Sequence, residues 1–195
     1  MWYKKIVAQA VTDKLISDIL KQYFEKQEFS KAKIERSPTI TRIIIYVGRK
    51  NSALSKLRKI EDELKEKLMK EFNLLNPTFV IEEVENPYLD AKIVAYRIRK
   101  AIERGVNFKK AAMFYIERAV ENGAAGIEVR ISGKLLGKER SAAYKFRKGY
   151  ILHSGYYKEK YVDVGYDEAL IKVGKIGIQV RILKQVPEEY VFEKW

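Results

Sequence analysis

Apolar residues recur at helical spacing in two segments of the first half of the chain. Residues 12–26 place them three or four positions apart, behind Thr12 as the predicted N-cap. Residues 57–72 repeat the spacing with four leucine or isoleucine residues. In this second segment three Glu–Lys pairs lie four positions apart with the acid first, which is typical of a solvated helical face. We therefore predict two amphipathic helices.

Capping signals delimit two more helices in the middle of the chain. The first is predicted over Asn86–Arg104, because Asn-Pro pairs a capping residue with proline at the first helical position and Gly105 follows as a C-terminal glycine. The second is predicted over Asn107–Asn122, with Gly123 after it. The connection between these two helices is therefore expected to be tight.

The remaining apolar segments have the spacing of strands. Two are short buried runs, and the others alternate apolar and polar residues with a period of two. They lie at residues 41–48, 78–84, 127–131, 161–170 and 176–183. The order of helices and strands predicts an α+β protein with two lobes that meet near Asn86.

The charge of the chain is strongly positive and unevenly distributed. The 195 residues have a formal net charge of +13. Residues 1–86 hold 17 Lys+Arg and 13 Asp+Glu, whereas residues 87–195 hold 22 and 13. Such an excess indicates a polyanionic partner, either nucleic acid or an acidic membrane surface, that meets the second half of the chain.

Residue types required by several kinds of chemistry are missing. Cysteine is absent and His153 is the only histidine, so thiolate chemistry, Cys-ligated zinc and two-histidine metal sites are excluded. No Walker, zinc-protease or nucleophile-elbow motif occurs. We expect no cofactor, no enzyme activity and a structural role for His153. The chain has neither a run of 18 apolar residues nor a leader-like start, so we expect an intracellular, cytosolic protein.

Two adjacent lysines, Lys109 and Lys110, fall in the first turn of a predicted helix. Cations are unfavourable there, because the helix N-terminus already has a partial positive charge. A bound phosphate would offset that repulsion and accept from the free backbone N–H groups. The alternative is that both lysines are merely solvated and screened by salt.

The most basic stretch of the chain is residues 128–149, with seven cations against two acids. Gly133 and Gly137 would let the backbone approach a ligand closely. Tyr144 and Phe146 would either stack on bases or anchor the core, and the core is favoured for Phe146. The stretch is predicted to be strand and loop rather than amphipathic helix, which favours nucleic acid over a membrane. Four cations of the preceding helix would extend the same surface: Arg97, Arg99, Lys100 and Arg104.

Four segments follow one another in an order that is specific when they are taken together. They are KIERSPTITRIIIYVGR, NPTFVIEEVENPYLDAKIVAYRIRKAIERGVNFKKAAMF, GAAGIEVRISGKLLGKERSAAYKFRKGYI and VDVGYDEALIKVGKIGIQVRIL. In this order they resemble the family of the small-subunit ribosomal protein number three, in its archaeal and eukaryotic form. The resemblance spans nearly the whole chain.

The resemblance implies a type II KH-like domain over residues 1–85. Over residues 86–195 it implies a C-terminal ribosomal α+β domain of two helices and a mostly antiparallel sheet. The implied partners are small-subunit rRNA in the head, mRNA at the entry channel and neighbouring head proteins of a cytoplasmic ribosome. Lys109 and Lys110 would face incoming mRNA and help to open its secondary structure, and the RISGKL loop would contact rRNA. The candidate RNA-binding residues are Lys56, Arg58, Lys59, Arg97, Lys100, Arg104, Lys109, Lys110, Arg130, Lys134, Lys138, Arg140, Lys145, Arg147 and Lys148.

Two features depart from that family. A KH domain holds the nucleic-acid backbone with a G-x-x-G loop between two helices, yet no glycine occurs between Gly48 and Gly105. SKLR, residues 55–58, stands where the loop belongs, so a helix is free to continue through it and KH-type binding is expected to be lost. Only loose electrostatic contact through the neighbouring cations would remain. Arg181 stands where the family more often has an aromatic residue.

Two alternative functions stay open on the sequence alone. Similar eukaryotic proteins are linked to lyase activity on abasic DNA, which requires a buried lysine of depressed pKa that forms a Schiff base. Lys134 and Lys172 are the candidates, although neither stands in a strongly apolar segment. The other alternative is a free-standing RNA chaperone or regulator.

Overall fold

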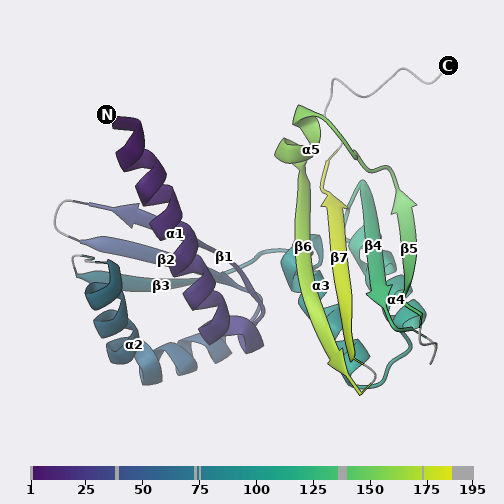
Figure 1. Cartoon of the computed structure of the whole chain (residues 1–195), viewed down its shortest axis with the longest axis horizontal. Helices are drawn as coiled ribbons and strands as arrows, with labels where there is room; N and C mark the ends of the chain where they lie inside the picture. Colours follow the sequence, from purple (N-terminus) through teal and green to yellow (C-terminus); the bar gives the residue numbers. More distant parts are fainter. Residues whose placement is uncertain are drawn as a thin grey trace. The chain divides into compact units, whose positions relative to one another are not determined.

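The structure is a computed structural model, and it describes residues 2–37, 40–72, 74, 76–135, 140–172 and 174–185. The chain divides into two compact units, Met1–Glu85 and Asn86–Trp195 (Figure 1). Each unit combines helices with one sheet. The α+β class predicted from the sequence is therefore confirmed.

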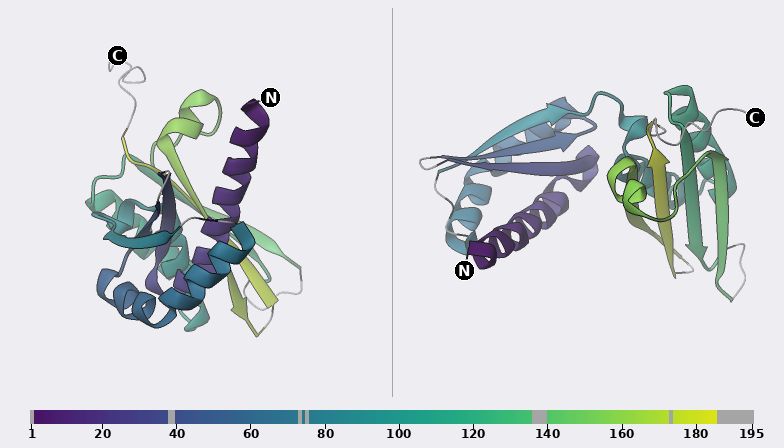
Figure 2. Two further views of the ribbon diagram at one scale, coloured as in Figure 1. Left: turned by 90° about the vertical axis from the view of Figure 1, so that its left-hand side faces the viewer. Right: turned by 90° about the horizontal axis from the view of Figure 1, so that it is seen from above.

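Two long helices and three strands form the first unit. They are α1 (Trp2–Phe24), β1 (Phe29–Arg36), β2 (Thr41–Val47), α2 (Lys50–Phe72) and β3 (Pro77–Glu83), with a 3-10 turn η1 (Glu25–Gln27) after α1. The strand order is β1-β2-β3, antiparallel between β1 and β2 and parallel between β2 and β3. Both helices lie on one face of this sheet (Figure 2). This arrangement agrees with the KH-like N-terminal fold.

The helices of the first unit are longer than the sequence pattern predicted. The predicted N-cap Thr12 lies inside α1, and its hydroxyl donates to the carbonyl of Gln9 at 2.7 Å. The preceding turns of α1 hold large apolar side chains that are exposed. The prediction left these turns out because it took Thr12 as the start of the helix. The helix predicted over residues 57–72 begins at Lys50. Strand β1 was not predicted, because charged residues occupy much of its exposed side.

The second unit is built on a four-stranded antiparallel sheet. Its elements are η2 (Pro87–Leu89), α3 (Ala91–Glu103), α4 (Phe108–Glu121), β4 (Gly126–Gly133), β5 (Ala142–Gly149), α5 (Tyr156–Tyr161), β6 (Val162–Ile171) and β7 (Gly174–Leu183). The strand order is β5-β4-β7-β6, so β5 and β6 are the edges. Helix α3 packs on β6 and β7, and α4 packs on β4 and β5. Both helices lie behind the strands in Figure 1.

One face of this second sheet forms the core under α3 and α4, whereas α5 packs on only one end of the other face, at Val162 and Leu183. Ile127, Val129 and Ile131 of β4 are fully buried against the helices, as the alternation predicted. The residues between them point to the opposite side, which we name the open face. Among the described residues of this unit, neither α3 nor α4 lies on that side (Figure 2). The open face is therefore the place where polar and charged side chains of the central strands gather.

Two predictions about the second unit were wrong in detail. The N-cap of α3 is Asp90 rather than Asn86, because Pro87–Leu89 forms a separate 3-10 turn before the helix. One carboxylate oxygen of Asp90 accepts from the N–H groups of Lys92 and Ile93, at 3.0 and 3.1 Å. The residues predicted to be loop after β4 include strand β5.

Candidate nucleic-acid interface

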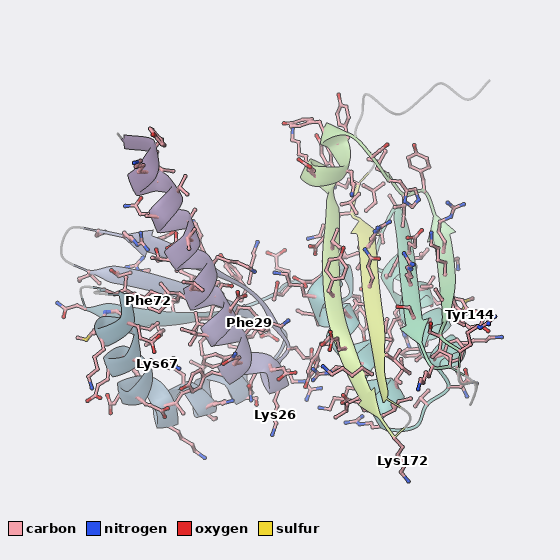
Figure 3. All side chains as sticks on the ribbon, in the orientation of Figure 1. Lys26, Phe29, Lys67, Phe72, Tyr144 and Lys172 are labelled. Atoms are coloured by element: carbon pink, nitrogen blue, oxygen red, sulfur yellow. The ribbon has the colours of Figure 1, made fainter. Side chains whose placement is uncertain are left out.

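The start of α4 places two cations beside the edge strand β5. Asn107 is the N-cap, as predicted, and its side-chain oxygen accepts from the backbone N–H of Lys109 at 2.9 Å. Lys109 and Lys110 are both exposed. The ammonium of Lys109 lies 5.7 Å from the centre of the Tyr144 ring, which Figure 3 shows at the β5 side of the second unit. The helix start and the edge strand thus form one charged region.

Eight exposed cations from this region form what we name the basic edge. They come from the first turn of α4, from β4 and the residues after it, and from β5 with the residue two positions before it. They are Lys109, Lys110, Arg130, Lys134, Arg140, Lys145, Arg147 and Lys148. Lys138, the remaining cation predicted here, lies outside the described residues.

Two of these cations face each other directly across strands. Arg130 of β4 is the register partner of Lys145 on β5, and both belong to the open face. Like charges at opposed positions repel and destabilise a strand pair. A bound polyanion would remove that repulsion and release its own counterions. The pair thus fits the predicted anionic partner, whose binding at these residues stays a prediction.

The aromatic residues of β5 belong to the core rather than to a free stacking surface. Tyr144 and Phe146 are half-buried, and their ring centres lie 5.3 and 6.4 Å from that of Phe108 on α4. Both pack against the cluster formed by α3, α4 and the sheet. The core reading favoured for Phe146 thus agrees with its packing, and it holds for Tyr144 as well.

Gly133 is explained by strand packing rather than by approach of a ligand. Its φ angle is +151°, and a Cβ atom there would lie 3.0 Å from the carbonyl oxygen of Lys175 and 3.1 Å from the Cα of Ile176. Glycine therefore allows β7 to approach the end of β4 closely. Gly137, the second glycine to which ligand approach was assigned, lies outside the described residues.

The cations of α3 are not part of the basic edge. Helix α3 covers β6 and β7, while the basic edge lies at β5 on the other side of the sheet. Arg97 and Lys100 are half-buried, with the guanidinium of Arg97 4.9 Å from the Tyr88 ring centre and the ammonium of Lys100 5.8 Å from that of Tyr96. Arg104 is exposed at the end of α3. The extension of the basic surface from residues 128–149 to Arg97, Lys100 and Arg104 therefore stays a prediction.

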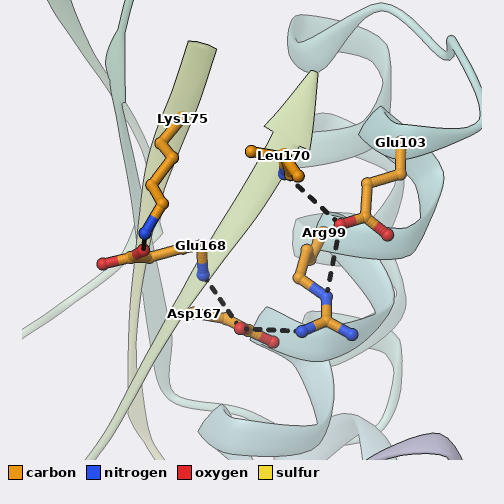
Figure 4. A network of polar contacts seen from close by, with 6 residues as sticks. All are labelled: Arg99, Glu103, Asp167, Glu168, Leu170 and Lys175. Carbon is orange, nitrogen blue, oxygen red and sulfur yellow. Dashed lines mark hydrogen bonds and ion pairs between the residues drawn. The ribbon is translucent and has the colours of Figure 1, made fainter. Parts of the chain in front are cut away.

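Arg99 of α3 is held in a network that ties the helix to β6 (Figure 4). Its guanidinium lies 3.3 Å from the Asp167 carboxylate and 3.7 Å from that of Glu103. The Glu103 carboxylate also accepts from the backbone N–H of Leu170 at 3.4 Å. The side chain of Arg99 is only 17% exposed, and its charge is neutralised by the neighbouring carboxylates. Its role is therefore to hold α3 on β6.

Helix α2 passes without interruption through the position of the KH loop. SKLR, residues 55–58, lies inside α2, so the structure has one helix where a KH domain has two helices and a loop. The ammonium of Lys56 donates to the carbonyl of Tyr23 and thereby joins α2 to α1. Arg58 and Lys59 are exposed on the same helix. Their contact with RNA stays a prediction.

A charged cluster that was not predicted lies on the open face of the second sheet. Glu128 and Arg181 are register partners on β4 and β7, and the Arg181 Nη1 lies 3.3 Å from the Glu128 Oε1 and 3.3 Å from the His153 Nδ1. The Glu128 side chain is only 6% exposed. The unusual Arg181 was the one signal in the sequence, but its partners lie far from it along the chain.

Neither lysine named as a lyase candidate is buried, and the described residues hold no cluster of potential metal ligands. Lys134 and Lys172 are exposed, whereas a Schiff-base lysine requires burial. No group of three or more potential metal ligands occurs in the described part of the chain. Likewise, none of the described helices combines the length and apolar character needed to cross a bilayer.

Comparison with known proteins identifies the same relatives over both units. The model of the ribosomal protein S3 C-terminal domain matches residues 98–182. The small ribosomal subunit protein uS3 of Methanococcus maripaludis strain C5 is 34% identical over 181 residues, which cover 93% of this chain and 85% of that protein. The uS3 proteins of Sulfurisphaera tokodaii and Methanocaldococcus jannaschii are 35% and 34% identical, over 93% and 98% of this chain and 80% and 93% of their own.

The fold defines a two-unit α+β protein with a KH-like N-terminal unit and a helix-covered antiparallel sheet after it. Its matches extend over nearly the full length of the chain and of its relatives. The chain belongs to the ribosomal protein S3 family, as the resemblance of its four segments predicted.

Proposed function

We propose that the chain is a structural component of the small ribosomal subunit that binds rRNA in the head and lines the mRNA entry channel. In this proposal residues 86–195 dock on rRNA, and the KH-like residues 1–85 add loose contacts through Arg58 and Lys59. Neighbouring head proteins are further partners. The observation that supports the proposal is the basic edge, in which eight exposed cations surround one edge strand.

Phosphate neutralisation is the mechanism by which the basic edge would act. Each Lys or Arg that meets a phosphate releases a condensed counterion, so binding is strong at low salt and falls steeply as salt rises. Lys109 and Lys110 place two ammonium groups at the N-terminal end of α4, whose partial positive charge also suits phosphates of the mRNA strand. Base pairs of the messenger would open when one strand is held there by its backbone.

Charge reversal tests this proposal. The triple variant K109E/K110E/R140E is compared with K14E/K21E/K26E, which makes the same charge change in the first unit. Binding of each protein to small-subunit rRNA is measured at several salt concentrations, together with incorporation into subunits and unwinding of a structured messenger. We expect the first variant to lose rRNA affinity at least tenfold and the second to keep it. If the two variants were equal in rRNA affinity, incorporation and unwinding, the basic edge would be excluded as the RNA-binding surface.

A further inference from the structure

A cavity of about 480 Å³ lies where the chain leaves β5, beside the open face. Its lining consists of Arg147 and residues 149–154. Gly149 has a φ angle of +77°, and a Cβ atom there would lie 2.3 Å from the carbonyl oxygen of Ala125, so only glycine lets the chain turn at this point. The N–H of Tyr150 then donates to the same carbonyl at 3.2 Å. Backbone contacts with the start of β4 therefore fix this wall of the cavity.

The lining combines an apolar base with an aromatic ring. Ile151 and Leu152 belong to the lining and are buried, and Leu152 forms a small apolar cluster with Val162 and Leu183. Tyr150 belongs to the same lining and is 53% exposed. A planar ligand can stack on such a ring and exclude water from the apolar surface at the same time.

The polar groups of the lining are held by the charged cluster on the open face. Arginine has only donors, so the contact between Arg181 Nη1 and His153 Nδ1 requires that Nδ1 accepts. Glu128, the one buried carboxylate nearby, is paired with Arg181, so its charge is compensated. The ring of His153 is held by this cluster, with Nδ1 3.3 Å from Arg181 Nη1 and Nε2 3.8 Å from Glu128 Oε2. Arg147 and Ser154 are therefore the polar residues of the lining that face a ligand without a partner in this cluster.

We propose that this cavity receives one nucleotide of single-stranded RNA, with its base on the Tyr150 ring and its phosphate on the Arg147 guanidinium. The volume falls in the range of small-ligand sites. A guanidinium matches the geometry of a phosphate, and the hydroxyl of Ser154 offers a hydrogen bond to a base edge. An acidic peptide would use Arg147 but would leave the Tyr150 ring unused. This inference rests on the proposed RNA-binding function and assigns one base-holding site within it.

The test uses the full chain and fluorescein-labelled RNA octamers of mixed sequence, with an abasic octamer of the same charge as the second probe. We expect the wild type to bind the base-containing octamer at least about fivefold more tightly than the abasic one, which is the lower end of one base–aromatic stack. Y150A removes this difference and leaves affinity for the abasic octamer unchanged. Y156A, which removes an exposed tyrosine on α5 outside the cavity, is the matched control and behaves as wild type. R147Q lowers the salt slope for both octamers by about one.

Several outcomes would overturn the proposal. One is equal binding of both octamers by the wild type, and another is a base preference that Y150A retains. A third is a Tyr150-dependent affinity for an acidic octapeptide without affinity for RNA octamers, which would make the cavity a protein site. If K109E/K110E/R140E still loses rRNA binding in any of these cases, the proposed function stands while the nucleotide cavity does not.

Discussion

The carboxylate of Glu128 and the guanidinium of Arg181 face each other across β4 and β7, with Oε1 and Nη1 3.3 Å apart. Their side chains are 6% and 21% exposed, so this ion pair lies largely out of water. Removal of one partner leaves a buried charge without compensation, whereas removal of both leaves none.

The first prediction concerns this ion pair. We expect R181L to lower the free energy of unfolding of the second unit by about 3 kcal/mol, because the buried Glu128 carboxylate loses its guanidinium partner and keeps only the 3.8 Å contact with His153 Nε2. The double variant E128L/R181L should recover most of that loss. Urea unfolding that is monitored by hydrogen exchange of the β4 amides gives the free energy of unfolding of the second unit alone. A double variant less stable than R181L would contradict the argument.

The second prediction separates two capping residues at the start of α3. D90A should lower the free energy of unfolding by about 1–2 kcal/mol, because the N–H groups of Lys92 and Ile93 lose their acceptor. N86A is the matched control. In the 3-10 turn the backbone carbonyl of Asn86 accepts from the N–H of Leu89, and this carbonyl is kept when the side chain is replaced. It should change stability by less than about 0.5 kcal/mol. A larger effect of N86A would restore Asn86 as the functional cap.

The third prediction concerns how steeply the affinity for RNA falls as the salt concentration rises. Arg130 and Lys145 are opposed cations, so each should meet its own phosphate when RNA binds. R130A and K145A should each reduce the slope of log affinity against log salt by about one, and the double variant by about two. K14A is the control, because Lys14 is paired with Asp18 on α1 of the first unit. If R130A and K14A change the slope equally, Arg130 is not a phosphate contact.

Those parts of the fold that depend on local signals were predictable. The ends of α3 and α4 were fixed by Gly105 and Gly123, whose φ angles are +88° and +92°. The buried face of β4 followed from the alternation of its isoleucine and valine residues. These signals lie within a few residues of the structure that they determine, so sequence spacing is sufficient to read them.

The parts that were missed depend on contacts between distant segments. Strand β5 alternates half-buried and exposed positions, but its exposed positions are so basic that the period of two was read as a charged loop. The candidate site was affected in the same way, because residues 109 and 144 meet only through the packing of α4 on β5. The pairing of Glu128 with Arg181, 53 residues apart, had no local signal.

The fourth prediction distinguishes a structural lysine from an exposed one on α2. K56M should lower the free energy of unfolding of the first unit by about 1–2 kcal/mol, because the carbonyl of Tyr23 loses a charged donor. Methionine keeps the apolar stem near the Phe24 ring, so the change reports mainly on the hydrogen bond. K59M, on the exposed side of the same helix, should leave stability within about 0.5 kcal/mol of the wild type. Hydrogen exchange of the α1 amides distinguishes K56M from K59M. Equal protection in both variants would contradict the structural role of Lys56.

The fifth prediction concerns the segment at residues 55–58, where a KH domain would have its glycine loop. The double variant S55G/R58G restores the G-x-x-G pattern inside α2, which is continuous over Lys50–Phe72. Because glycine is unfavourable inside a helix, we expect a loss of about 1–2 kcal/mol in the free energy of unfolding. S55A/R58A is the control and should keep or slightly raise stability, since alanine is the best helix former. Affinity for a single-stranded RNA octamer should not rise in the glycine variant, because the loop would have to interrupt a helix that Leu57, Leu64 and Leu68 hold in the core. A glycine variant that keeps wild-type stability and gains RNA affinity would instead mean that a KH-type loop forms readily at this position.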